Sequence, residues 1–288
     1  MRGSRGVLPR IRGAGLSVLL VALLAPADIA VGAPPTGAPI RTTPPFATAV
    51  PWILPVDAWE AGVTSGTVFD ERAPFDNAGA GAIDRSRSVL LGDVAFGLDE
   101  RVEGSISFSG QTSWGDESGN HPAPGDLRLG FGYALDGRGD TAVATTARFS
   151  VKVPTAPDRH GAGTDEADLG IDLTSGVRTA RSGIFGSAGF ALLGNPLENG
   201  SQDDIVSYAL AGWTGREDVL QATAEIEGQA LSRFGNSASY LHLGVRRVHR
   251  QPGGRALAGH AAISRGLSRD ASLWGITLGL TWAAPSGR

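Results

Sequence analysis

Residues 125–155 read GDLRLGFGYALDGRGDTAVATTARFSVKVPT, and this stretch decides the fold of the chain. In its first arm, large apolar residues occupy every second position from Leu127 to Leu135. In its second arm the same alternation runs from Val143 to Val153. Only an extended chain places every second side chain on one face, so both arms are predicted strands. The turn-forming residues of Asp136–Asp140 join the two arms, and we predict a β-hairpin.

Each arm of the hairpin is about ten residues long, which is the length of a tilted strand that crosses a bilayer. One face of the hairpin is apolar, whereas the other carries Arg128, Arg148 and Lys152. A two-sheet sandwich in solution gives the same alternation. The hairpin alone therefore leaves both architectures open, and the rest of the chain has to decide between them.

The period of two recurs after residue 55 and predicts about twelve strands. They lie near residues 57–69, 87–98, 102–114, 126–135, 141–154, 167–178, 184–193, 205–214, 219–232, 239–249, 256–265 and 272–282. The connections alternate in length. Those near 71–86, 115–125, 154–166 and 194–204 are long and polar, and those near 99–101, 136–140, 179–182 and 215–218 are short. Outer-membrane barrels have this alternation, because tight turns face the periplasm and longer loops face outwards.

The final predicted strand carries a tryptophan at each end of an aliphatic stretch, Trp274 and Trp282. Together with Trp114, these residues are candidates for an aromatic girdle at the two membrane interfaces. No segment after the N-terminal region is long and apolar enough for a membrane helix, so a membrane-spanning sheet would have to close on itself. We therefore predict an all-β protein, a closed antiparallel transmembrane β-barrel of about twelve strands over residues 56–288. An open sandwich would leave the first and last strands unpaired with each other.

The N-terminal region has the features of an export signal. Four arginines precede residue 13, and the apolar run Ala14–Ala25 follows them, which predicts a signal peptide over residues 1–27 with cleavage near Ala25-Pro26-Ala27. This run is too short for a membrane-anchoring helix. Residues 28–55 are rich in proline and predict either an extended periplasmic leader or a plug in the barrel mouth. The expected location is the outer membrane of a Gram-negative-type bacterium.

Composition argues against several functions. The chain has no cysteine, which removes thiol catalysis, disulfides and thiolate metal sites. Its net charge is −4 and no basic cluster is interleaved with aromatic residues, so we expect no nucleic-acid partner. The five histidines show no metal-ligand spacing, and no GxSxG motif is present. We predict no catalytic residue, metal or cofactor, and no enzyme activity.

Charged residues of the predicted strands fall on the face opposite the apolar one, because a charge in lipid costs roughly 2–4 kcal/mol at the bilayer midplane. The predicted lumen-lining residues are Glu103, Arg128, Arg148, Lys152, Asp172, Glu225, Glu227, His242 and Arg246. Asp168 shares their face. We expect Arg128, Arg148 and Lys152 to form a basic stripe that orients anionic or aromatic solutes, while the acids keep the wall near neutral.

Two segments resemble an outer-membrane β-barrel family named for the MetA pathway of phenol degradation. In that family a GDxxL strand precedes a strand ending in KxPTG, and a loop with GxG and an aspartate follows. The matching residues here are Gly125, Asp126, Leu129, Lys152, Pro154, Thr155, Gly161, Gly163, Asp165 and Gly170. Ala156 stands where the family usually has glycine.

The resemblance implies a barrel that passes small hydrophobic or aromatic compounds. Its partners would be outer-membrane lipids, such a solute, and the barrel-assembly machinery, because the last strand also resembles an assembly signal. Two other functions remain open. One is a structural or lipid-contacting barrel without transport, and the other is a lipid hydrolase that uses His242 or His260 with a serine such as Ser239 or Ser264.

Overall fold

The computed structural model describes residues 49–69, 86–114, 121–136, 142–156, 166–194, 204–231, 237–268 and 271–285. The predicted signal peptide and residues 28–48 of the proline-rich segment lie outside the described residues. No helix in the described ranges is long and apolar enough to cross a membrane.

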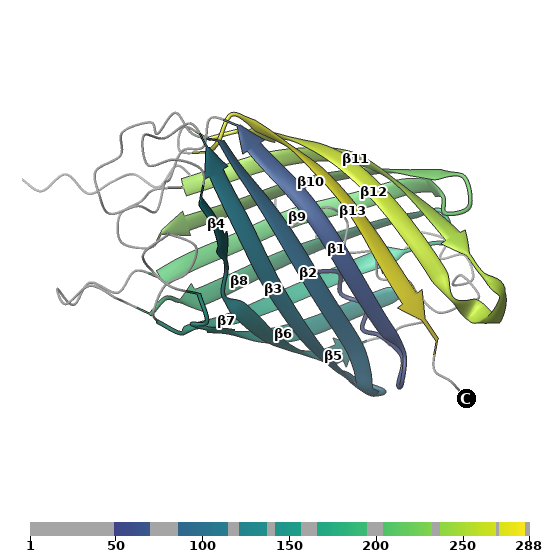
Figure 1. Ribbon diagram of the computed structural model, residues 1–288. Helices are drawn as coiled ribbons and strands as arrows, with labels where there is room; N and C mark the ends of the chain where they lie inside the picture. Colours follow the sequence, from purple (N-terminus) through teal and green to yellow (C-terminus); the bar gives the residue numbers. More distant parts are fainter. Residues whose placement is uncertain are drawn as a thin grey trace, which may run out of the picture. The chain divides into compact units, whose positions relative to one another are not determined.

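The described residues form thirteen β-strands and one short 3-10 turn, η2 (Figure 1). The strands are β1 (Trp59–Phe69), β2 (Ser86–Asp99), β3 (Val102–Trp114), β4 (His121–Pro124), β5 (Leu127–Asp136), β6 (Val143–Val153), β7 (Asp168–Arg178), β8 (Ser182–Leu192), β9 (Asp204–Arg216), β10 (Leu220–Leu231), β11 (Ser237–Arg250), β12 (Ala256–Gly266) and β13 (Trp274–Ala284). The turn η2 spans Pro252–Gly254, between β11 and β12.

The sheet closes through the pairing of the first strand with the last. β1 pairs with β2 on one side and with β13 on the other, and Val63 lies opposite Leu280. All neighbouring strands are antiparallel. The short β4 pairs with one end of β3, and β5 pairs with the remainder of β3. Apart from β4, twelve strands therefore form the closed ring, which confirms the predicted barrel and excludes the open sandwich.

The predicted loop over residues 115–125 is corrected by β4, which occupies 121–124. Its sequence is HPAP, and proline disfavours a strand because it cannot donate a backbone hydrogen bond. Here the prolines are tolerated because, among the described strands, β4 pairs with β3 alone and lies at an edge. One side of an edge strand forms no interstrand hydrogen bonds. A proline whose missing N–H would point to that side therefore removes no hydrogen bond from the sheet.

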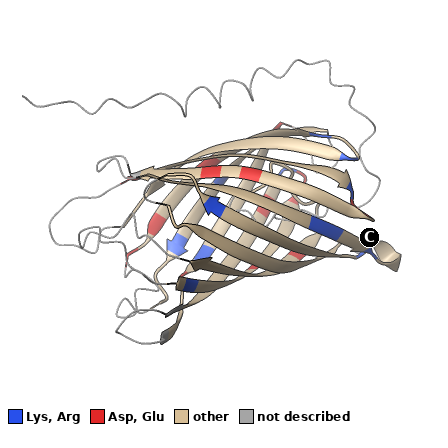
Figure 2. Ribbon diagram, turned by 90° about the horizontal axis from the view of Figure 1, so that it is seen from above, with Lys and Arg blue, Asp and Glu red and all other residues tan. Residues whose placement is uncertain are grey.

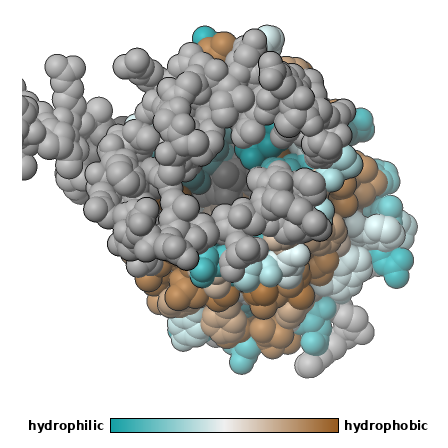
Figure 3. All heavy atoms as spheres, turned by 60° about the vertical axis from the view of Figure 1, so that its left-hand side comes forward, coloured by the Kyte–Doolittle hydropathy of each residue, from teal (hydrophilic) through white to brown (hydrophobic). Residues whose placement is uncertain are grey.

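The two faces of the barrel differ in chemistry, as the alternation predicts. The outward side chains of β5 and β13 are large and apolar, and Phe131 and Leu278 are 45% and 57% exposed. Figure 3 shows this hydrophobic surface as brown atoms on the barrel wall. Soluble monomers rarely expose so continuous an apolar surface. It is the surface expected of a strand barrel whose outer wall faces lipid.

Aromatic rings pair across β1 and β13 at both ends of these strands. The ring centroids of Phe69 and Trp274 are 6.1 Å apart, and those of Trp59 and Trp282 are 6.3 Å apart. Both tryptophans of β13 are about half exposed on the outer face. Trp114 is the last residue of β3. That these three tryptophans form a girdle at the membrane interfaces stays a prediction.

Tight turns gather at one end of the barrel, together with the start of β1 and the end of β13. In the turn between β9 and β10, the Arg216 guanidinium donates to both carboxylate oxygens of Asp218, at 3.1 and 2.6 Å. This bond holds the pKa of Asp218 below its ordinary value. The strand topology does not define which end of the barrel faces the periplasm, so that assignment stays a prediction.

Charges placed on the two faces should have unequal effects on assembly. Phe131→Arg and Leu278→Arg each put a charge on the outer apolar face, at a cost of about 2–4 kcal/mol near the bilayer centre. We expect both variants to lower the yield of folded barrel, measured as the heat-modifiable fraction in electrophoresis. Ser107→Arg is the matched control, because Ser107 faces inwards opposite Asp93. Equal losses in all three variants would contradict the assignment of the faces.

Candidate functional site

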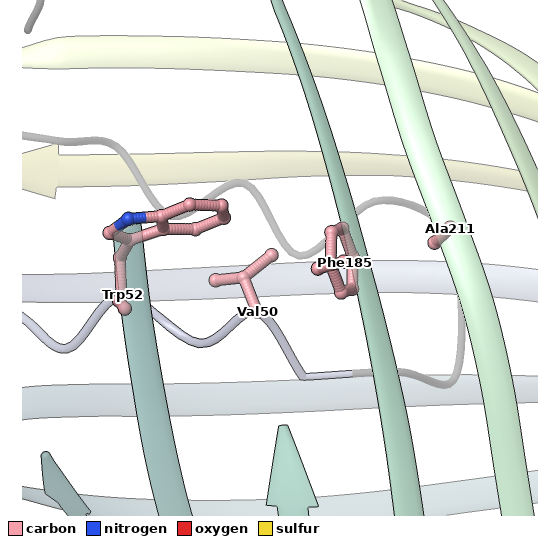
Figure 4. Close-up of a cluster of buried hydrophobic side chains, with 5 residues drawn as sticks. Val50, Trp52, Phe185 and Ala211 are labelled. Atoms are coloured by element: carbon pink, nitrogen blue, oxygen red, sulfur yellow. The ribbon is translucent and has the colours of Figure 1, made fainter. Parts of the chain in front are cut away.

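The described part of the proline-rich segment lies inside the barrel. Residues 50–54 read VPWIL, and Trp52, Ile53 and Leu54 are at most 2% exposed. Figure 4 shows Val50 and Trp52 on this segment beside Phe185 of β8 and Ala211 of β9. Pro51 and Pro55 flank residues 52–54 and have no backbone N–H group to donate. The segment therefore runs through the lumen without joining the sheet. We call residues 50–55 the inner segment.

A glycine of β2 allows the inner segment to approach the wall. Val56 forms a parallel bridge with Gly97, and the Asp57 amide donates to the Gly97 carbonyl at 3.1 Å. The Gly97 amide in turn donates to the Ala58 carbonyl at 2.9 Å. A Cβ atom at Gly97 would collide with the carbonyl oxygen of Pro55. The close contact of segment and wall therefore requires glycine at this position.

An ion pair on the wall holds the backbone of the inner segment. Arg148 of β6 binds Glu103 of β3 at 2.9 Å, and its second terminal nitrogen donates to the Val50 carbonyl at 2.8 Å. The other Glu103 oxygen accepts from the Leu54 amide at 2.9 Å. The Thr146 hydroxyl donates to the Pro51 carbonyl. The three bonds that involve Arg148 or Glu103 have a charged partner, so each of them is stronger than a hydrogen bond between neutral groups.

Trp52 is enclosed by aromatic rings and a cation. Its ring lies edge-on to Phe185 and Trp213, with centroid distances of 6.4 and 5.8 Å, and Phe185 and Trp213 are 6.2 Å apart. The Arg178 guanidinium lies 4.7 Å from the centroid of the Trp52 ring, in a cation–π contact. Val50 and Ala144 belong to the same buried cluster. We call Arg178, Phe185 and Trp213 the tryptophan cage.

Strand register places all nine predicted lumen residues on the inner face, opposite the apolar one. Arg128 lies opposite Lys152, Arg148 opposite Asp172, and Glu225 opposite His242. Glu227 lies two residues beyond Glu225 on the same face, and Arg246 lies opposite Gln221. Acidic and basic positions are interspersed along the strands (Figure 2). That these residues line a path for solute stays a prediction.

The predicted basic stripe is interrupted by carboxylates. Lys152 binds Asp168 at 2.6 Å, and Arg148 binds Glu103 instead of remaining available to solute. Arg148 reaches Glu103 across Gly132 of the intervening strand β5, where a Cβ atom would lie 2.9 Å from the Arg148 guanidinium. His242 binds Glu227 at 3.0 Å. Arg148 and Lys152 of the stripe therefore act within acid–base pairs.

Sequence reasoning missed the tryptophan cage and Thr146. Phe185 and Trp213 belong to the two strands whose alternation is ambiguous, because small residues occupy both faces there. A large aromatic residue among small inward-facing ones is a signal that could have marked them. For Trp52, the sequence predicts only that the surrounding residues 28–55 form either an extended leader or a plug in the barrel mouth.

No protein-family model and no curated protein matches this chain. Among solved structures, an outer membrane channel from Pseudomonas putida F1 is similar, with 13% identity over 83% of this chain and 99% of that chain and a TM-score of 0.60. The NanC porin is similar with 10% identity over 78% of this chain and 98% of that chain, and a TM-score of 0.51. At these identities the likeness defines the fold as an outer-membrane-type β-barrel. Membership of the MetA-pathway family stays a prediction.

A side chain at Gly97 should expel the inner segment. The chain has no cysteine, so a single Ile53→Cys substitution gives a specific reporter for a position that is 1% exposed. We expect Gly97→Val to accelerate maleimide labelling of this cysteine about tenfold or more in the folded barrel, since valine would overlap Pro55. Gly66→Ala is the control, because a Cβ atom there meets only ordinary contacts, the nearest at 3.6 Å. Unchanged labelling in the Gly97 variant would show that the segment does not depend on this contact.

Proposed function

We propose that this chain is an outer-membrane channel for small molecules and that the inner segment is its plug. The proposal rests on one observation. The barrel is closed and has a polar inner wall, and a short segment outside the sheet lies in its lumen, where a few specific hydrogen bonds hold it. A barrel of this fold with an apolar outer wall belongs in a lipid bilayer. The outer membrane is therefore the proposed location.

The chemistry of the wall supports passage of solute without strong selection by charge sign. Several acids and bases of the inner face are paired, as in Arg148 with Glu103 and Lys152 with Asp168. A ring of charges of one sign would favour ions of the opposite sign, whereas paired charges present a surface that is polar and close to neutral. Such a wall suits small solutes that carry both polar and apolar parts.

The tryptophan cage supports an aromatic solute. Trp52 fills a site made of two aromatic rings and the Arg178 guanidinium, and each contact in it is available to any flat ring of similar size. When the inner segment withdraws, the cage can receive the ring of a solute in place of Trp52. This agrees with the aromatic compounds that the family resemblance implies.

The hydrolase alternative is disfavoured by the positions of the serines. Ser239 faces outwards, where its hydroxyl bonds the Tyr208 hydroxyl at 2.9 Å, whereas His242 faces the lumen. Ser264 lies opposite His242, but its hydroxyl extends toward β13, 2.8 Å from the position of a Cβ atom on Gly275. Neither hydroxyl is directed at His242. A structural barrel without transport remains the second candidate, because a plugged and charge-paired lumen fits it equally well.

Weakening the plug should open the channel. Arg148→Gln removes the charged bonds to Glu103 and to the Val50 carbonyl, each worth about 1.5–3 kcal/mol. We expect its open probability in planar bilayers to rise about tenfold or more over the unmodified protein. Lys152→Gln is the matched control, since Lys152 lies on the same strand and face but binds Asp168.

Locking the plug should have the opposite effect. Val50 and Ala144 belong to one buried cluster, so we choose a Val50→Cys/Ala144→Cys pair in this cysteine-free chain and verify its disulfide by mass spectrometry after oxidation. The oxidised protein should be silent and recover on reduction. Equal conductance of the oxidised pair and the Arg148 variant would exclude the plug. Absence of conductance in every folded variant would exclude transport and leave the structural barrel.

A further inference from the structure

One row of inward-facing polar residues crosses three neighbouring strands. Gln221 of β10 lies opposite Arg246 of β11, and Arg246 lies opposite His260 of β12. Thr223 is two residues from Gln221 on the same face. All four side chains are buried, with at most 7% of their surface exposed. Residues directly opposite each other on antiparallel strands have Cβ atoms about 4.5–5.5 Å apart, so the four residues belong to one buried patch of the inner wall.

Several polar atoms of this patch lack a hydrogen-bond partner within the part of the chain that the structure describes. They are Arg246 Nε, Thr223 Oγ1, Gln221 Oε1 and both ring nitrogens of His260. Glu60 and Glu217 influence Arg246 electrostatically, but neither forms an ion pair with it in the described ranges. Glu217 is bound by Arg250 at 2.7 Å. Arg246 is therefore a buried cation without a bound counter-ion among these residues.

Two glycines shape the wall beside the patch. The Thr223 hydroxyl lies over Gly244, 2.8 Å from the position of a Cβ atom there. The His260 ring lies over Gly279 of β13 and extends toward Thr64 of β1. The absence of side chains at both glycines lets the hydroxyl and the ring lie flat along the wall. The Thr223 hydroxyl thus lies above β11, two residues along the strand from Arg246, and the His260 ring lies above β13, beyond the strand that pairs with β11.

An uncompensated buried guanidinium is unfavourable, because arginine cannot lose its proton to escape the loss of hydration. Its planar fork of N–H groups matches the two oxygens of a carboxylate. The Thr223 hydroxyl and the His260 imidazole, which belong to the same buried row of the wall, offer further donors. We propose that Arg246, with Thr223 and His260, binds the carboxylate of a small solute on the lumen wall. This inference rests on the proposed channel function and adds a solute class to it.

Glu225 also faces the lumen on β10, two residues beyond Thr223. The negative charge of this carboxylate repels a dianion more strongly than a monoanion, so the site suits a monoanion. The site differs from the predicted basic stripe, whose Arg148 and Lys152 already bind carboxylates of the protein itself. Among the inward-facing arginines of the described strands, Arg246 differs from Arg128 and Arg148 in being buried without an ion pair, and we therefore assign it to the ligand.

Titration calorimetry of the folded full-length barrel in detergent tests the proposal, with benzoate and its neutral analogue benzyl alcohol as probes. We expect the unmodified protein to bind benzoate at least tenfold more tightly than benzyl alcohol. Arg246→Gln should weaken benzoate binding at least tenfold. Arg247→Gln is the matched control, since Arg247 is the next residue on the same strand, faces outwards and is exposed, and its Kd should change less than twofold.

The comparison of the two probes on unmodified protein decides the outcome even if Arg246→Gln fails to fold. Equal affinities for benzoate and benzyl alcohol, or equal effects of the two arginine substitutions, would overturn the site. Calorimetry in detergent needs no conduction, so the two proposals fail separately. If the protein binds benzoate but never conducts, the channel proposal is excluded and the carboxylate site is supported. If it conducts but shows no preference for benzoate, the carboxylate site is excluded and the channel proposal is supported.

Discussion

The structure depends on the antiparallel pairing of β1 with β13. Inside a bilayer no water is available to satisfy a free strand edge, so a sheet that spans the membrane has to close. The two strands pair along their full length, from Trp59 opposite Ala284 to Phe69 opposite Trp274. Closure also determines which residues of each strand face the lumen, because residues paired across neighbouring strands point to the same side of the sheet. The burial of Glu60, Glu103 and Arg246 and the exposure of Leu278 follow from this one register.

Most of the fold could be predicted from the sequence because period-two alternation is local. Leu127, Leu129 and Phe131 identify an outward face without any knowledge of the neighbouring strands. The observed strand positions, the closed sheet and its ring of twelve strands agree with the prediction from this alternation. β4 could not be predicted, since its two prolines argue against a strand. Only its position at an edge, which is a property of the assembled sheet, makes them acceptable.

The partners inside the lumen could not be predicted, because long side chains cross from one strand to the next but one. Arg148 reaches Glu103 over Gly132, and Asp172 approaches Ser207 over Gly189. A register between non-adjacent strands is needed to recognise such pairs. The contacts of Trp52 depend on β8 and β9, which follow it by more than a hundred residues. The sequence indicated which residues face inwards, whereas their pairing is a property of the closed barrel.

The inner segment is joined to the barrel by only three residues, Val56 to Ala58, before β1 begins. So short a tether makes its return to the lumen an intramolecular step, with an effective concentration in the millimolar range or above. Contacts that would be too weak to hold a separate peptide can therefore keep the segment in place most of the time. In the proposed channel, each departure of the inner segment should be brief, and the conductance should flicker between two levels. The length of this connection, as much as the strength of the bonds at Arg148 and Glu103, would then set the fraction of time for which solute can pass.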